Sequence, residues 1–188
     1  MVLCGIILGL HWIAFFKSIQ VSTVAIGLLT FASYPLFTTF LEPIFFQEKL
    51  SKRNISGLFF VICGLALIAT SQSENSESML SGSAIEGVLW GLAGGLGFAL
   101  LTLLNRDYVR HHSPLLLTCW QNGFAAIILL PWSLAESWIL TKADWALLFV
   151  LGVICTVGGH ALLINGLRNV QAQTASMLIA GLEPVCAI

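Results

Sequence analysis

Apolar segments about as long as a lipid bilayer is thick follow one another along most of this chain. A helix needs about 20 predominantly apolar residues to cross the hydrocarbon core of a membrane. None of the segments shows the two-residue alternation of a membrane β-strand, so helices are the predicted spanning elements. Seven spans are predicted, namely Val2–Phe16, Val24–Phe46, Ile55–Thr70, Ile85–Leu104, Pro114–Leu134, Trp145–Leu167 and Thr174–Ile188. The first is short at its start and the last stops within a helix, so we expect both to continue beyond this chain.

The composition excludes an ordinary soluble domain. Hydrophobic residues make up 57% of the 188 residues and charged residues only 9%, whereas soluble domains average about 25% charged residues. The mean hydropathy is +0.93. The predicted fold class is therefore an all-α membrane protein, a polytopic bundle of transmembrane helices in a lipid bilayer. The formal net charge of −1 supplies no basic field, so no nucleic-acid partner is predicted.

The five cysteines do not form a metal or redox motif. They are scattered, without a C-x-x-C pair or a metal-ligand spacing, and most lie within apolar runs, where cysteine usually behaves as a small buried hydrophobe. They are Cys4, Cys63, Cys119, Cys155 and Cys186. The sequence therefore predicts neither a metal nor another cofactor.

The basic residues indicate how the helices are oriented. Cytoplasmic loops of membrane proteins carry an excess of lysine and arginine. The loops after the second, fourth and sixth predicted spans hold six of these residues, namely Lys49, Lys52, Arg53, Arg106, Arg110 and Arg168, while the other loops hold Lys17 and Lys142. We therefore predict that the first group of loops is cytoplasmic, in a multi-pass protein of the inner (plasma) membrane.

A short motif occurs twice, at loops that lie on opposite sides of the predicted membrane. "FKSIQVSTVA" (Phe16–Ala25) is similar to "LRNVQAQTAS" (Leu167–Ser176). Each copy has a histidine upstream and a proline downstream, which are His11 and Pro35 for the first and His160 and Pro184 for the second. Equivalent segments of opposite orientation indicate an inverted-topology repeat, a common plan of secondary transporters. Such proteins bind substrate near the midplane beside interrupted helices, which explains a proline within the apolar run around Pro35.

The second predicted span and its surroundings resemble a known family. In "SIQVSTVAIGLLTFASYPLFTTFLEPIFFQEKLS" (Ser18–Ser51) a proline, Pro35, precedes a helix-ending glutamate, Glu48, and two glycines follow at Gly57 and Gly64. The later "LEPV" repeats the proline as Pro184. This pattern resembles the EamA-type members of the drug/metabolite transporter superfamily, although Gln47 stands where the family usually has glycine.

The resemblance implies an architecture of ten helices in two inverted groups of five, of which about seven are present here. Residues 1–70 would form the C-terminal part of the first repeat, 71–84 an external polar linker, and 85–188 the N-terminal part of the second repeat. The family implies a secondary active transporter, an exporter of a small organic metabolite such as an amino acid, working by alternating access. Coupling protons are a further expected partner, and a homodimer is left open.

Polar residues recur at helical spacing on one face of the second predicted span. They are Thr30, Ser33, Tyr34, Thr38 and Glu42, and a polar stripe in lipid should face the bundle or a water-filled cavity. Tyr34 is a candidate cavity residue. Glu42 could couple protons or bind substrate, or it could reach cytoplasmic water with help from Lys49 or Lys52. The second interpretation is slightly favoured, because only a few residues separate Glu42 from the charged loop.

Two histidines and a second carboxylate are further candidates for the substrate cavity. His11 and His160 lie inside equivalent helices and could relay protons, or each could simply hydrogen-bond a neighbouring helix. Glu183, beside Pro184, is farther from a charged loop than Glu42 and is the better candidate for a buried carboxylate. The loop histidines, His111 and His112, are predicted to be solvated.

The fourth predicted span carries small residues at intervals of four. Gly87, Gly91 and Gly95 permit close helix packing in a membrane, and no strand precedes them as a nucleotide-binding loop would require. Trp90, on the same helix, could line the cavity, with core packing an equal alternative.

Two other classes of function compete with transport. An intramembrane enzyme could use His160 or His11 with a carboxylate, but the sequence shows no nucleophile or metal constellation to support it, so the chain is predicted not to be an enzyme. A non-functional transporter fragment is the other alternative, because helices without their partners would expose polar stripes to lipid.

Overall fold

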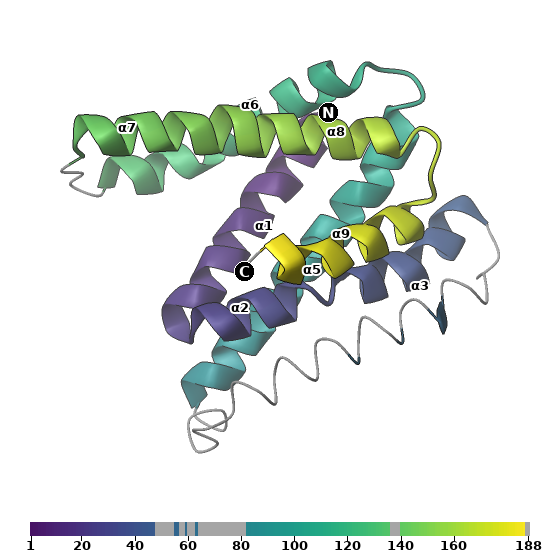
Figure 1. Ribbon diagram of the computed structural model, residues 1–188, viewed down its shortest axis with the longest axis horizontal. Helices are drawn as coiled ribbons and strands as arrows, with labels where there is room; N and C mark the ends of the chain where they lie inside the picture. The colour runs from purple at the N-terminus through teal and green to yellow at the C-terminus, as the bar shows by residue number, and fades with distance from the viewer. Residues whose placement is uncertain (48–54, 57–58, 60–62, 64–81, 136–139, 187–188) are drawn as a thin grey trace.

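The computed structural model describes residues 1–47, 55–56, 59, 63, 82–135 and 140–186, and in this part of the chain the regular structure is helical throughout (Figure 1). The helices are α1 (Val2–Val21), α2 (Val24–Phe31), α3 (Tyr34–Phe46), α5 (Gly82–Tyr108), α6 (Pro114–Ala135), α7 (Lys142–Phe149), the π-helix η3 (Val150–Gly158), α8 (Gly159–Gly166) and α9 (Ala172–Cys186).

The predicted fold class is confirmed. Five stretches of the described chain are long and apolar enough to cross a membrane, namely Val2–Val21, Val24–Phe46, Ser83–Tyr108, Pro114–Ala135 and Lys142–Gly166. They correspond to the first, second, fourth, fifth and sixth predicted spans, and α9 takes the place of the seventh. The third predicted span, Ile55–Thr70, and the glycines Gly57 and Gly64 lie mostly or wholly outside the described residues, as does Glu48.

Helix ends differ from the prediction by a few residues. The first span does not stop at Phe16 but continues to Val21, so that it reaches 20 residues with Lys17 inside the helix. A lysine is tolerated there because its long stem can carry the ammonium group to the membrane surface. The fourth span likewise continues past Leu104 to Tyr108, which places Arg106 in a helix rather than in a loop.

The second span is broken near its middle, as the proline predicted. Helix α2 ends at Phe31, and Ser33 is the N-cap residue of α3. Pro35 therefore occupies the first turn of α3, where no N–H is required. The Ser33 hydroxyl donates to the Thr30 carbonyl at 2.6 Å, satisfying one of the groups that the break releases. On the other side of the break, the Ala32 backbone nitrogen donates to the Leu28 carbonyl at 2.8 Å.

Two hydrogen bonds define how α1 runs relative to α5. The His11 ring forms a hydrogen bond with the Gly94 carbonyl oxygen, and the Ser18 hydroxyl donates to the Gly87 carbonyl oxygen. The later residue of α1 thus meets the earlier residue of α5, so the two helices are antiparallel. Met1, at the start of α1, packs against the same apolar cluster as Leu167, just after α8. The start of α1 and the end of α8, the two helices that precede the copies of the repeated motif, therefore lie beside the same apolar cluster.

The glycine stripe of α5 brings this helix against α1 and α2. A Cβ atom at Gly87 would collide with Ser22, and one at Gly91 would collide with Thr30. At Gly95 it would lie 3.2 Å from the Phe31 carbonyl oxygen. The prediction of close packing through these glycines is confirmed, and α5 is the element around which the first three helices are arranged (Figure 1).

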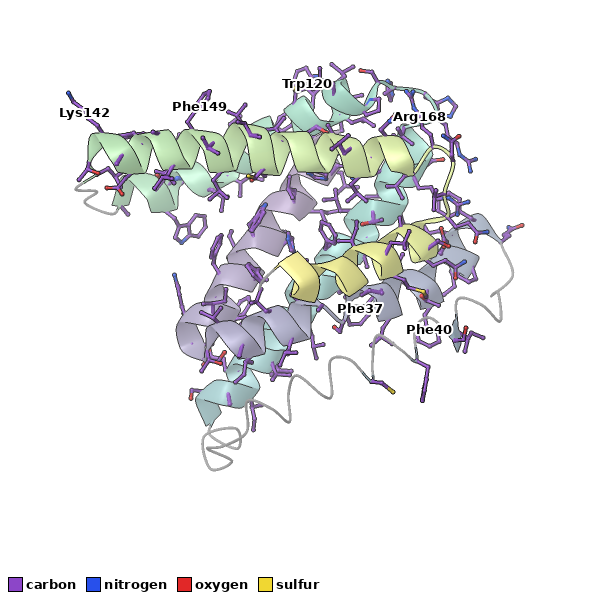
Figure 2. The ribbon with its side chains drawn as sticks, in the orientation of Figure 1. Phe37, Phe40, Trp120, Lys142, Phe149 and Arg168 are labelled. Carbon is purple, nitrogen blue, oxygen red and sulfur yellow. The ribbon has the colours of Figure 1, made fainter. Side chains whose placement is uncertain are left out.

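The span from α7 to α8 exposes most of its surface. Side chains such as Phe149 and Lys142 project away from the rest of the bundle (Figure 2). The exposed apolar residues of this span include Trp145, Leu147, Leu151, Ile154 and Leu162. Lipid tails are as apolar as these side chains, so such a surface is stable in a bilayer and unsuited to water.

We expect Gly91→Ala to destabilise the protein, because the added methyl group collides with Thr30. Overpacking of this kind costs about 1–3 kcal/mol. Gly123→Ala is the matched control, since Gly123 is also helical and a Cβ atom added there would meet no other atom within 4 Å. Unfolding of the purified protein in detergent measures both. Equal stability of the two variants would contradict the packing described here.

Candidate functional site

Glu42, on α3, is fully buried and accepts hydrogen bonds from two other helices. Its Oε1 atom lies 2.6 Å from Nη1 of Arg106 on α5 and 2.6 Å from the backbone nitrogen of Ala172. Its Oε2 atom accepts from the backbone nitrogen of Gln173 at 2.9 Å. We call Glu42, Arg106, Ala172 and Gln173 the Glu42 cluster. It neutralises one charge with another and satisfies two N–H groups at the start of α9.

Local structure explains why these groups meet. Tyr34, Thr38 and Glu42 share one buried face of α3, because residues four apart lie on the same side of a helix. This confirms that the predicted polar stripe faces the bundle. Helix α9 starts at Ala172, and its first N–H groups have no partner within the helix. A carboxylate is favoured at that position because a helix N-terminus carries partial positive charge.

The interpretation that Glu42 reaches cytoplasmic water is wrong. Its side chain is 0% exposed, and it is paired with Arg106. Lys49 and Lys52 lie outside the described residues. An ion buried in an apolar environment requires a paired counter-charge. That requirement is met by a residue 64 positions away, which local charge patterns could not identify.

Arg106 is a functional candidate that the sequence did not predict, because its charge placed it in a loop. Its guanidinium group also lies over the Phe46 ring, 4.4 Å from the centroid. One signal points to it: the stripe of Gly87, Gly91 and Gly95 continues at helical spacing through Thr102 to Arg106. A basic residue that extends a packing stripe is buried more readily than one in a loop.

His11 and Tyr34 belong to one aromatic cluster in the centre of the bundle. The rings of Phe31 and Phe98 each contact both residues, with centroid separations of 5.0–5.3 Å. His11 Nδ1 lies 2.9 Å from the Gly94 carbonyl oxygen. The Tyr34 hydroxyl donates to the Ser176 carbonyl on α9 at 2.9 Å. Two predicted site residues from different helices are thus brought together at the contact with α9.

The remaining candidates lie in three different surroundings. His160, at the start of α8, is half-buried, and its buried Nε2 atom has no hydrogen-bond partner among the described atoms. Trp90 is 38% exposed and its indole nitrogen donates to Glu86 at 3.3 Å. Glu183 belongs to helix α9, but the structure does not describe its side chain.

Two hollows on the described surface are lined by other residues. One, of about 510 Å³, lies along α7 and η3 and includes Asp144, Leu148 and Leu151. The other, of about 210 Å³, lies between α8 and α9 and is apolar. Neither of these two hollows is lined by a predicted site residue.

The fold and this buried polar centre define a class: a polytopic helical membrane protein whose charged and aromatic residues meet inside the bundle. The chain belongs to the EamA-like transporter family, whose model matches residues 1–70 and 85–188. The resemblance noted from the Pro35 motif is therefore confirmed.

Curated relatives carry transporter names. The chain is 28% identical over 186 residues to the uncharacterized transporter YxxF of Bacillus subtilis, an alignment covering 98% of this chain and 58% of that protein. It is 26% identical over 174 residues to an uncharacterized transporter of Archaeoglobus fulgidus, covering 93% and 59%. YyaM of Bacillus subtilis is 25% identical, covering 91% and 57%. The chain thus spans less than two thirds of these relatives, and no solved structure matches it.

We expect Arg106→Gln to destabilise the protein by about 3–5 kcal/mol, because removing one member of a buried ion pair leaves the other without a counter-charge. Arg110→Gln is the matched control: Arg110 lies one turn later, is exposed, and also approaches the Phe46 ring, at 5.9 Å. Its loss should change stability by about 0.5 kcal/mol or less. Equal effects of the two substitutions in a denaturation experiment would show that the buried pair has no special role.

Proposed function

We propose that this chain is part of a secondary active transporter that exports a small organic metabolite, such as an amino acid, by alternating access in the inner (plasma) membrane. Membership of a family of transporters supports the general activity. The proposal extends it to a solute class, an outward direction and protons as the coupling ion. It assigns the chain no enzymatic activity.

The observation that carries the proposal is the buried contact between the two segments predicted to be repeats. Tyr34, from residues 1–70, bonds Ser176, from residues 85–188, at 2.9 Å, in a cluster that also holds His11. In inverted-repeat transporters the substrate binds between the repeats, beside interrupted helices. The break between α2 and α3 lies immediately before Tyr34, which supports a site here.

The proposed cavity residues are His11, Tyr34, His160 and Glu183, with Trp90 nearer the surface. Alternating access requires that a closed conformation pack such residues together and that another separate them. The tight ring contacts around Tyr34 suit a closed conformation. Histidine suits proton coupling, because its ordinary pKa lies near physiological pH. The Nε2 atom of His160, which has no hydrogen-bond partner in the described part of the chain, leaves one position for a proton or a solute group.

We expect Tyr34→Phe to reduce solute flux by about 2- to 10-fold, the effect of losing one neutral hydrogen bond. Tyr108→Phe is the control, since Tyr108 is the only other tyrosine in the sequence, and it is half-buried beside His112. Efflux of radiolabelled amino acids and related solutes from proteoliposomes measures both. The protein is expressed from its own reading frame, so that any sequence beyond this chain is included. Equal flux in both variants would argue against a site at Tyr34.

We further expect His160→Ala to reduce flux about tenfold, a change that corresponds to 1.4 kcal/mol, because it removes a buried polar atom that we assign to the cavity. His111→Ala, in an exposed loop, should leave flux unchanged. A variant that folds normally and transports at the rate of the unmodified protein would exclude His160 from the cavity.

A further inference from the structure

The Glu42 cluster joins α9 to a helix that lies far away in the sequence. Helices α2 and α7 are capped by their own neighbouring residues: Thr23 accepts from the Ile26 nitrogen, and Thr141 accepts from the Asp144 nitrogen. A local cap moves with its helix and does not restrict helix–helix motion. Helix α9 instead depends on Glu42, 130 positions earlier. Any movement of α9 away from α3 must therefore break these bonds.

The local sequence explains this dependence. The residue before α9 is Gln171, and glutamine is not among the side chains preferred as helix N-caps. The carboxylate that caps α9 also pairs with Arg106. Three donors converge on Glu42 from residues 85–188, while Glu42 belongs to residues 1–70. The cluster is thus a charged contact between the two segments predicted to be repeats.

The same contact contains buried polar atoms that could form hydrogen bonds with water. Thr39 Oγ1 and Gln173 Oε1 are buried and have no hydrogen-bond partner among the described atoms, and their residues are 1% and 0% exposed. A buried acceptor without a partner is unfavourable in the dry state and is satisfied once water enters. Hydration of these two atoms would offset part of the free energy lost when the bonds to Glu42 break.

The cluster lies at one end of the bundle. It is formed near the end of α3, near the end of α5 and at the start of α9, next to the three loops predicted to be cytoplasmic. Arg168, labelled in Figure 2, lies in the last of these loops. It donates to the Val109 and His112 carbonyls at 3.3 and 3.2 Å. Closure at this place would separate the Tyr34 region from the cytoplasm.

We propose that Glu42, Arg106 and the N-terminus of α9 form the cytoplasmic gate of the transporter. The gate is closed when the carboxylate holds Arg106 and α9, and it opens when α9 leaves Glu42 and water reaches Thr39 and Gln173. This inference rests on the proposed transport function, since a gate needs a path to close.

Reactivity of a single cysteine at position 39 tests the gate without a known solute. The five natural cysteines are replaced by alanine, Thr39→Cys is introduced, and a membrane-impermeant maleimide is applied to the cytoplasmic face of oriented vesicles. We expect slow labelling when Glu42 is present. Glu42→Gln should raise the rate about 10- to 100-fold, the effect of losing one charge-assisted hydrogen bond. Glu86→Gln, an exposed carboxylate elsewhere on α5, should leave it unchanged.

A second reporter distinguishes opening from unfolding. Ser22 lies between α1 and α2, at the opposite end of the bundle. Ser22→Cys, in the same cysteine-free background, is labelled from the face opposite the cytoplasmic one. An opened gate raises the rate at position 39 while the rate at position 22 stays equal or falls. Labelling that rises alike at both ends, or does not rise at position 39, would overturn the proposal.

A milder variant covers the case in which Glu42→Gln does not fold. Arg106→Lys keeps a positive charge but loses the planar fork that binds a carboxylate, and we expect it to raise labelling at position 39 by a smaller factor. Unchanged labelling in this variant would also overturn the proposal. The two proposals can fail separately. If the protein transports a solute but Glu42→Gln is labelled at position 39 as slowly as the protein with Glu42, the gate is rejected and the transport function stands. If Glu42→Gln is labelled faster at position 39 but no tested solute is transported, the transport function is rejected.

Discussion

A carboxylate inside an apolar bundle must be given partners, and supplying them to Glu42 determines how three helices of this protein meet. Arg106 provides the counter-charge, and the first two N–H groups of α9 provide the remaining hydrogen bonds. Each charge-assisted bond contributes about 1.5–3 kcal/mol. Without Glu42, both the guanidinium group and the start of α9 would be buried without these partners, so the ends of α3, α5 and α9 are mutually dependent.

The glycine stripe of α5 makes that meeting possible. Because Gly87, Gly91 and Gly95 have no side chains, α1 and α2 approach the backbone of α5 closely. The close approach sets the path of α3, which continues from α2 after the break at Ser33. It thereby brings Glu42 level with Arg106, and it brings Tyr34 and His11 into one aromatic cluster.

Much of the architecture follows from the sequence because a membrane imposes simple requirements. A span needs about 20 apolar residues, and Pro35 indicated the break between α2 and α3. The burial of the polar face of α3 was predicted from helical spacing and the cost of polar groups in lipid. The ends of α1 and α5 were less predictable, since Lys17 and Arg106 can each end a span or extend one.

The sequence by itself determined the helical membrane fold, the predicted orientation of the spans and the family. These depend on the length and polarity of continuous segments. Only the tertiary structure decided that Glu42 is buried, that it pairs with Arg106, and that Tyr34 reaches Ser176. The physical reason is that these contacts join residues 64, 130 and 142 positions apart. Their meeting depends on how helices pack, which no local pattern records.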